Sequence, residues 1–275
     1  MDRLKYLLKL SRPRFWMYLA GPALVGLVYG DLSAVLTPEG LGLLIYFLLP
    51  ANIALYGIND YFDRDIDEEN PKKEEKEEVY RGARWVDLTV AISAALSIPV
   101  ALTLSSRTWP WFAAFLFLSV AYSAPPLRFK ARPFLDSLSN GLYLTPFVIA
   151  YVHAAGGLPP VEVLAGGWLW TMAMHTFSAI PDIGPDRRSG VETTATFLGR
   201  ERTYGYCTAV WSLSAVSFAT HSALLGALFS FYPLLCAAVY LSGVEDSRAY
   251  WWYPYINGLT GMVITLYGLR VLVGG

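Results

Sequence analysis

The chain has 275 residues, of which 55% are hydrophobic and only 16% are charged, and its formal net charge is −1. A soluble domain usually carries about a quarter charged residues. This composition excludes a soluble enzyme, a disordered protein and a nucleic-acid-binding protein.

Long stretches without Asp, Glu, Lys or Arg predict the membrane-spanning helices. About 20 apolar residues cross the hydrocarbon core of a bilayer, and the charge-free run 203–244 is long enough for two spans. In chain order, the predicted spans are 15–30, 41–59, 86–106, 108–125, 135–155, 161–181, 203–223, 226–244 and 250–272. The sequence therefore predicts an all-α, polytopic membrane protein with about nine transmembrane helices, folded as a single domain over residues 1–275.

The placement of basic residues predicts the orientation of these helices. With nine spans and a cytoplasmic N-terminus, all of the 21 Lys and Arg residues except Arg107 and Arg270 fall on the cytoplasmic side. This bias is typical of membrane proteins, whose cytoplasmic loops carry an excess of Lys and Arg. We therefore expect a multi-pass cell-membrane protein with its N-terminus in the cytoplasm and its C-terminus on the opposite side.

Acidic residues cluster in two of the cytoplasmic connections, residues 60–84 after the second span and residues 182–202 after the sixth. The two clusters lie four helices apart, which predicts a duplicated four-helix unit, helices 1–4 and 5–8, with a ninth helix appended. Internal repeats of this kind are common in membrane folds. The active site is expected on the cytoplasmic side, where both clusters lie.

The spacing of the aspartates within each cluster points to a metal site. Asp60, Asp63 and Asp67 are three and four residues apart, which places them on one face of a helix, with Asn59 one turn from Asp63. Asp182 and Asp186 are four apart and share a face in the same way. Five carboxylates at one mouth would repel one another. Magnesium held by a few carboxylates and by substrate phosphates would relieve this repulsion.

The acidic residues have two other interpretations. The interleaved Glu and Lys residues at 68–78 are typical of a solvated rim. An EF-hand would place ligands at Asp63, Asp65, Asp67 and Glu74, but position 6 of that loop requires glycine and is Glu68 here. The EF-hand is therefore set aside.

Basic residues flank the acidic clusters and favour a phosphorylated ligand. A pocket with carboxylates, a divalent metal and fixed cations is suited to a diphosphate. The strongest candidates are Arg128 and Lys130, because the paired prolines of Tyr122–Lys130 shape that loop. Many such residues only set topology, and that alternative stays open for each of Arg64, Arg128, Lys130, Arg187 and Arg188.

The pattern Asn59-Asp60-x-x-Asp63-x-x-x-Asp67, together with Asp182-x-x-x-Asp186, resembles the two signature motifs of the UbiA superfamily of intramembrane prenyltransferases. The resemblance implies a Mg²⁺-dependent transferase that ionises an allylic prenyl diphosphate and joins the prenyl group to a lipophilic acceptor within the bilayer. It also implies that the five aspartates are the catalytic metal ligands.

Further segments are similar to the lycopene elongases of this superfamily, namely Ser11–Trp16, Asn70–Lys73, Tyr122–Pro133 and His175–Asp182. That branch implies transfer of dimethylallyl units to lycopene in the synthesis of fifty-carbon carotenoids. An aromatic quinone precursor and a glyceryl-ether lipid stay open as acceptors. Many superfamily members have a further Asp three residues before the second motif, where this chain has Ala179.

Each of three further polar residues has more than one expected role. Arg14 lines the acceptor pocket or anchors the first helix. His175, predicted on the same helix face as Asp182, accepts a proton, bonds Asp182 or makes a structural bond between helices. Asp136 orients Lys130 or caps a helix.

A transporter or cation channel is the alternative of another class. It is disfavoured because the ionisable residues lie at one membrane face, whereas alternating access favours polar groups near the midplane.

Overall fold

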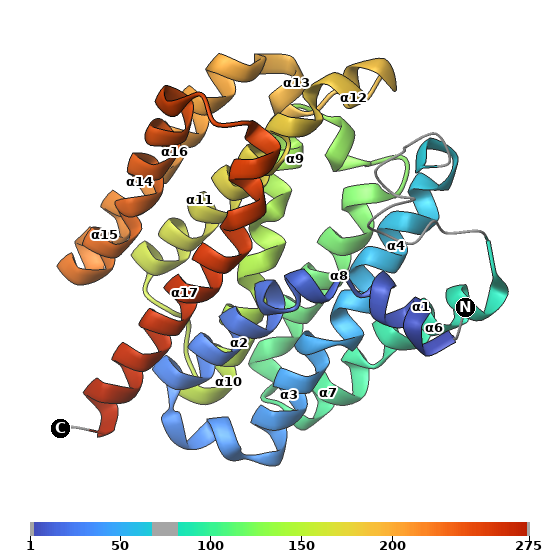
Figure 1. Cartoon of the computed structure of the whole chain (residues 1–275). Helices are drawn as coiled ribbons and strands as arrows, with labels where there is room; N and C mark the ends of the chain where they lie inside the picture. The colour runs from blue at the N-terminus through green and yellow to red at the C-terminus, as the bar shows by residue number, and fades with distance from the viewer. Residues whose placement is uncertain (1–2, 68–81, 274–275) are drawn as a thin grey trace. The chain divides into compact units, whose positions relative to one another are not determined.

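The computed structural model describes residues 3–67 and 82–273, with side chains described for 3–64 and 82–270 (Figure 1). Over these ranges the chain forms helices and connecting turns and no β-strand. The Cα positions divide the chain into two compact units. The first unit comprises 1–127, 145–158 and 261–275, and the second comprises 128–144 and 159–260.

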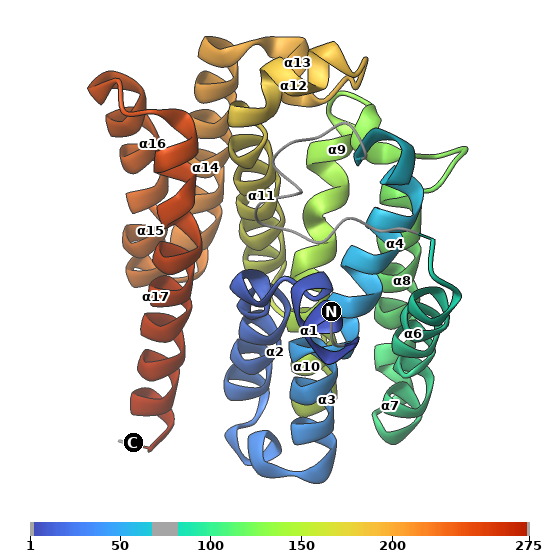
Figure 2. The same cartoon turned by 45° about the vertical axis from the view of Figure 1, so that its right-hand side comes forward.

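In the first unit, α4 packs against both α6 and α8, and α2 packs along α10 (Figures 1 and 2). This arrangement places the end of α4, which carries Asp60, Asp63 and Asp67, beside the end of α8. The α-helices of this unit are α1 (Arg3–Leu10), α2 (Met17–Gly30), α3 (Pro38–Leu48), α4 (Pro50–Asp67), α6 (Arg84–Ala95), α7 (Ser97–Thr103), α8 (Trp109–Ser123) and α10 (Thr145–Ala155). Its 3₁₀ helices are η1 (Pro13–Phe15), η2 (Leu32–Leu36) and η3 (Ser106–Thr108).

In the second unit, α11 packs along α14, which also contacts α15 and α16. Its core is aromatic: the ring of Trp211 stacks on Tyr253 and packs against Phe177 and Tyr232, and all four side chains are buried. The 3₁₀ helices of this unit are η4 (Phe129–Ala131), η5 (Ser139–Leu144) and η6 (Ile180–Asp182). Its α-helices are α9 (Leu135–Leu138), α11 (Val161–Ser178), α12 (Ile183–Arg188), α13 (Thr194–Leu198), α14 (Arg200–His221), α15 (Ala223–Phe229), α16 (Phe231–Ser242) and the first half of α17 (Asp246–Val273).

Within the described residues, each predicted span corresponds to one helix or to consecutive helices. Three helical segments, Pro38–Arg64, Arg84–Thr103 and Ala223–Ser242, have the length and apolar composition to cross a membrane. The predicted span 135–155 is interrupted by η5. The reason is local: Asn140 donates from Nδ2 to the carbonyl of Asp136 at 2.6 Å, competing with the helical hydrogen bond.

Glycine permits the close approach of α2 and α10. A Cβ at Gly26 would overlap the carbonyl oxygen of Phe147 and lie 2.8 Å from the Cβ of Ala150. We therefore expect Gly26→Ala to lower the free energy of unfolding by about 1–3 kcal/mol, the usual cost of overpacking. Gly21→Ala in the same helix is the control, because its Cβ would meet only Met17, at 3.7 Å. Thermal unfolding in detergent checks this, and equal effects of the two substitutions would contradict it.

A charged cluster joins the starts of α14 and α17 in the second unit. Arg200 donates from Nε and Nη2 to the two oxygens of Asp246, each at 2.8 Å, and the Tyr204 hydroxyl donates to the same carboxylate at 2.8 Å. Burial alone would raise the pKa of Asp246, but the hydrogen bonds from Arg200 and Tyr204 outweigh burial and lower it.

This lowered pKa predicts an acid-sensitive contribution to stability. A carboxylate with a lowered folded-state pKa stabilises the fold above its unfolded pKa, about 4, and that contribution disappears as the pH falls through the folded value. Wild-type protein should therefore unfold at a higher temperature than Asp246→Asn at pH 7, and this difference should shrink as the pH is lowered below 4. A difference that does not change with pH would contradict the account.

Candidate functional site

Motif one, defined as Asn59, Asp60, Asp63 and Asp67, lies on the last turns of α4. The helix continues to Asp67, so the backbone spacing places the three aspartates on one face, as the sequence predicts. Asp60 is 3% exposed and Asp63 is half-buried. The side chain of Asp67 lies outside the described part of the chain.

Arg12 contacts motif one, although the sequence did not predict this pairing. Its Nη2 donates to Oδ1 of Asp60 at 3.0 Å, and its guanidinium lies 4.6 Å from the ring centroid of Tyr56. Arg12 has a left-handed backbone, φ 49°, immediately before Pro13. The available signal was the Arg12-Pro13 pair in the Ser11–Trp16 segment. Arg14, the arginine predicted at the acceptor pocket or as an anchor of the first helix, has its guanidinium 5.6 Å from the ring centroid of Phe15.

Motif one is also tied to α8. Ser123 donates from Oγ to Oδ1 of Asn59 at 2.9 Å, which fixes the orientation of that amide. Ser123 follows Tyr122, a predicted substrate-binding residue that is half-buried at the end of α8. The structure thus brings together, in the first unit, Arg12, Asn59, Asp60 and the end of α8. Arg64, one residue after Asp63, is exposed.

Motif two, Asp182 and Asp186, lies in the second unit between α11 and α13. Asp182 is the last residue of η6 and Asp186 lies within α12, and both side chains are half-buried. The backbone amide of Val191 donates to the carbonyl of Asp186 at 2.9 Å and closes the turn that follows.

The predicted common helix face for His175 and Asp182 is wrong. Helix α11 ends at Ser178, and the 3₁₀ turn η6 separates the two residues. Pro181 explains the break. The α conformation is disfavoured for the residue before a proline, and proline itself has no backbone N–H to donate to the helix.

The basic loop, residues Arg128–Arg132, precedes α9 in the second unit. Arg128 has a left-handed backbone, φ 39°, and Lys130 lies in η4; both side chains are half-buried. Arg187, beside Asp186, is exposed and donates from Nη2 to the carbonyl of Thr196 at 2.9 Å. One unit therefore holds motif two, the basic loop and Arg187.

Asp136 does not take the predicted role of orienting Lys130. Its carboxylate is fully buried and accepts hydrogen bonds from the backbone amide of Thr194, at 2.9 Å, and from the Thr194 hydroxyl. The Nε2 atom of His175 lies 3.9 Å from Oδ2 of Asp136. His175, in the last turn of α11, therefore lies beside the buried carboxylate of Asp136.

The carboxylates of the two motifs fit magnesium by their chemistry. Hard oxygen donors suit Mg²⁺, which is usually held by one or two carboxylates and by substrate phosphates and keeps several waters. Among the described residues, no three His, Cys, Asp or Glu side chains gather closely enough to hold a metal ion by themselves.

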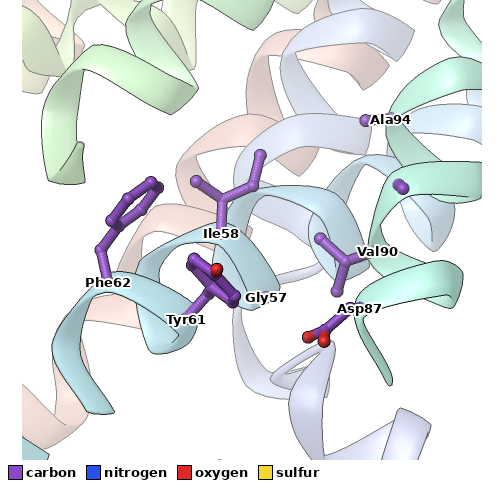
Figure 3. Close-up of a pocket in the computed structure, with 8 residues that line it drawn as sticks. Gly57, Ile58, Tyr61, Phe62, Asp87, Val90 and Ala94 are labelled. Atoms are coloured by element: carbon purple, nitrogen blue, oxygen red, sulfur yellow. The ribbon is translucent and has the colours of Figure 1, made fainter. Parts of the chain in front are cut away.

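A pocket of about 390 Å³ lies beside motif one, between α4 and α6 (Figure 3). Gly57, Ile58, Tyr61 and Phe62 line it from α4, and Asp87, Val90, Ala91 and Ala94 line it from α6. Neither Asp60 nor Asp63 lines this pocket, so it opens on a different face of α4 from the aspartates.

Known proteins resemble this chain along most of its length. The UbiA prenyltransferase family matches residues 19–260. A lycopene elongase/hydratase of Haloferax volcanii is 53% identical, and the match covers 100% of this chain and 92% of that protein. A lycopene elongase/hydratase of Halobacterium salinarum is 53% identical, covering 98% and 99% respectively.

The fold is shared with a solved structure as well. A UbiA homolog from Archaeoglobus fulgidus, bound to GPP and Mg²⁺, superimposes with a TM-score of 0.78 at 20% identity, covering 98% of this chain and 99% of that one. These likenesses confirm the resemblance predicted from the two aspartate motifs and the predicted all-α membrane fold. The chain belongs to the UbiA prenyltransferase family, a family of integral membrane proteins.

Proposed function

We propose that this enzyme transfers a dimethylallyl group from its diphosphate to lycopene in fifty-carbon carotenoid synthesis, and that it requires Mg²⁺. One observation carries the proposal: the 53% identity to lycopene elongase/hydratase proteins extends over essentially the whole chain. Solved homologs of the same fold bind GPP or DMAPP with Mg²⁺, which supports an allylic diphosphate as the donor.

Each predicted site residue has a part in this proposal. Mg²⁺ held at this site would neutralise the diphosphate and make it a better leaving group. The residues that would hold the metal are Asp60, Asp63, Asp67, Asp182 and Asp186. The residues that would bind the donor or the acceptor are Arg14, Asn59, Arg64, Tyr122, Arg128, Lys130, His175 and Arg187.

The reaction breaks the bond between the allylic carbon and the diphosphate oxygen, and the electron pair leaves with the diphosphate. A double bond of the acceptor then attacks the allylic cation and forms the new carbon–carbon bond. The resulting cation loses a proton or gains water and then loses a proton. The chain's part is to hold the diphosphate by fixed cations and to keep water from the allylic cation before attack.

Competition between acceptors tests the proposed substrate. Purified protein in liposomes would receive dimethylallyl diphosphate, Mg²⁺ and equal amounts of lycopene, a glyceryl-ether phosphate and homogentisate. The last two acceptors are chosen because less similar relatives include a digeranylgeranylglyceryl phosphate synthase, which is 32% identical, and a homogentisate phytyltransferase. Prenylated lycopene as the main product supports the proposal. Prenylation of another acceptor in its place would overturn the lycopene assignment and leave the enzyme class intact.

We also propose that the N-terminus and both motifs face the cytoplasm, with the C-terminus on the opposite side. The distribution of Lys and Arg supports this orientation. Both native cysteines, Cys207 and Cys236, are buried, so single cysteines can report on accessibility. Ser189→Cys should react with an impermeant maleimide only in inverted vesicles, and Ser33→Cys only in intact cells. The reverse pattern would overturn the orientation.

A further inference from the structure

The buried carboxylate of Asp136 joins three segments of the second unit that are distant in sequence. It lies in α9, four residues after the basic loop, and it is fully buried. Its oxygens accept hydrogen bonds from the amide and the hydroxyl of Thr194, the first residue of α13. The third segment is the end of α11, where His175 Nε2 lies 3.9 Å from Oδ2 of Asp136.

Asp136 lies close to both ends of the segment that carries motif two, and it is hydrogen-bonded to the second end, at Thr194. His175 lies seven residues before Asp182, and Thr194 lies eight residues after Asp186. The chain therefore leaves the neighbourhood of Asp136 at the end of α11, forms η6 and α12 with the two aspartates, and returns to Asp136 at the start of α13. The hydrogen bonds of Thr194 to Asp136 therefore anchor the segment just after motif two.

The same contacts anchor the basic loop. The Thr194 hydroxyl accepts a hydrogen bond from the backbone amide of Phe134 at 2.7 Å while it donates to Asp136. Phe134 has a left-handed backbone, φ 67°, which side-chain-bearing residues rarely adopt and which needs support from its surroundings. The Thr194 hydroxyl thus fixes the chain two residues after the basic loop, at the same carboxylate that anchors motif two.

We propose that Asp136, acting through Thr194, is a positioning residue that sets motif two and the basic loop in a fixed relation for binding of the diphosphate. The inference rests on the proposed function, because it assigns both segments to the diphosphate and its metal. Burial gives the contact its strength, since a buried carboxylate that loses a donor is left without a replacement from water.

Thr194→Val is the sharpest test, because it keeps the size and branching of the side chain and removes only the hydroxyl. Thr194→Ser keeps the hydroxyl and should behave like wild type. Ser214→Ala is the matched control: Ser214 is fully buried in the same unit, and its hydroxyl donates to the carbonyl of Gly166 at 2.7 Å, away from both segments.

Two readouts are needed, one of which does not depend on catalysis. In metal-free protein, hydrogen exchange of the amides of residues 183–194 should be faster in Thr194→Val and unchanged in Thr194→Ser and Ser214→Ala. With Mg²⁺ present, kcat/KM for dimethylallyl diphosphate should fall about 100-fold in Thr194→Val, the scale expected for a small misplacement of binding groups. The KM for the acceptor should stay unchanged.

The possible failures are distinguishable. If Thr194→Val matches Ser214→Ala in both exchange and kinetics, the contact only stabilises the fold and the inference is overturned. If wild-type protein releases no diphosphate with any allylic donor, the proposed function is overturned, even where faster exchange in Thr194→Val supports the anchoring of residues 183–194.

Discussion

Replacing Asp63 by asparagine is expected to lower Mg²⁺-dependent diphosphate release by about 1,000-fold, the upper range for loss of one group that stabilises transition-state charge. The substitution keeps the shape of the side chain and removes the negative charge that a divalent cation needs. Asp63 is half-buried near the end of α4, so the fold should tolerate the change. Release of diphosphate from dimethylallyl diphosphate, measured over a range of Mg²⁺ concentrations, checks the expectation.

Asp87→Asn provides the matched control for this experiment. Asp87 lies on α6 in the same unit and lines the pocket on a different face of α4 from the motif-one aspartates. We expect this variant to keep wild-type activity. If Asp63→Asn and Asp87→Asn lose activity to the same extent, the assignment of Asp63 to the metal is wrong.

Replacing Arg12 by alanine is expected to destabilise the metal-free protein by about 2 kcal/mol, the usual value of a hydrogen bond to a charged group. Asp60 is 3% exposed and would lose the cation that lies 3.0 Å from its carboxylate. Because a metal ion would offer Asp60 a new positive partner, Mg²⁺ with a diphosphate analogue should stabilise Arg12→Ala more than it stabilises wild type. Thermal unfolding with and without these ligands measures both effects.

Arg14→Ala separates this local role from a general need for basic residues at the N-terminus. The guanidinium of Arg14 lies 5.6 Å from the ring centroid of Phe15, whereas that of Arg12 lies 3.0 Å from the Asp60 carboxylate. We expect a smaller loss of stability in the metal-free protein and no added ligand-induced stabilisation. The account of Arg12 fails if the two variants respond alike to the ligands.

The fold could be predicted from sequence because its signals are local and long. Charge-free runs near 20 residues identify apolar helices regardless of tertiary contacts, and each predicted span has a helical counterpart in the described residues. The breaks in the helices are harder to predict, because the sequence signal for each break is a single residue. Pro181 marks the end of α11, whereas the interruption at η5 depends on the side chain of Asn140 reaching one particular carbonyl.

The common helix face of the motif-one aspartates was predictable, but the partners of the polar residues were not. Spacings of three and four residues express helix geometry directly, so motif one could be identified on one helix face. The Arg12–Asp60 pair joins residues 48 positions apart, and the Asp136–Thr194 contact joins residues 58 apart. Many arginines and buried acids could have made such contacts, and only the packing of the helices selects these pairs.

The most direct test of the central claim is the mass of the carotenoid that the purified enzyme produces. Wild-type protein in liposomes with lycopene, dimethylallyl diphosphate and Mg²⁺ should yield a product heavier by one or two five-carbon units. Neither EDTA-treated protein nor Asp63→Asn should yield it. If active protein with Mg²⁺ consumes dimethylallyl diphosphate while lycopene keeps its mass, the proposed acceptor is wrong. If no allylic diphosphate is consumed under any of these conditions, the proposed prenyl transfer itself is contradicted.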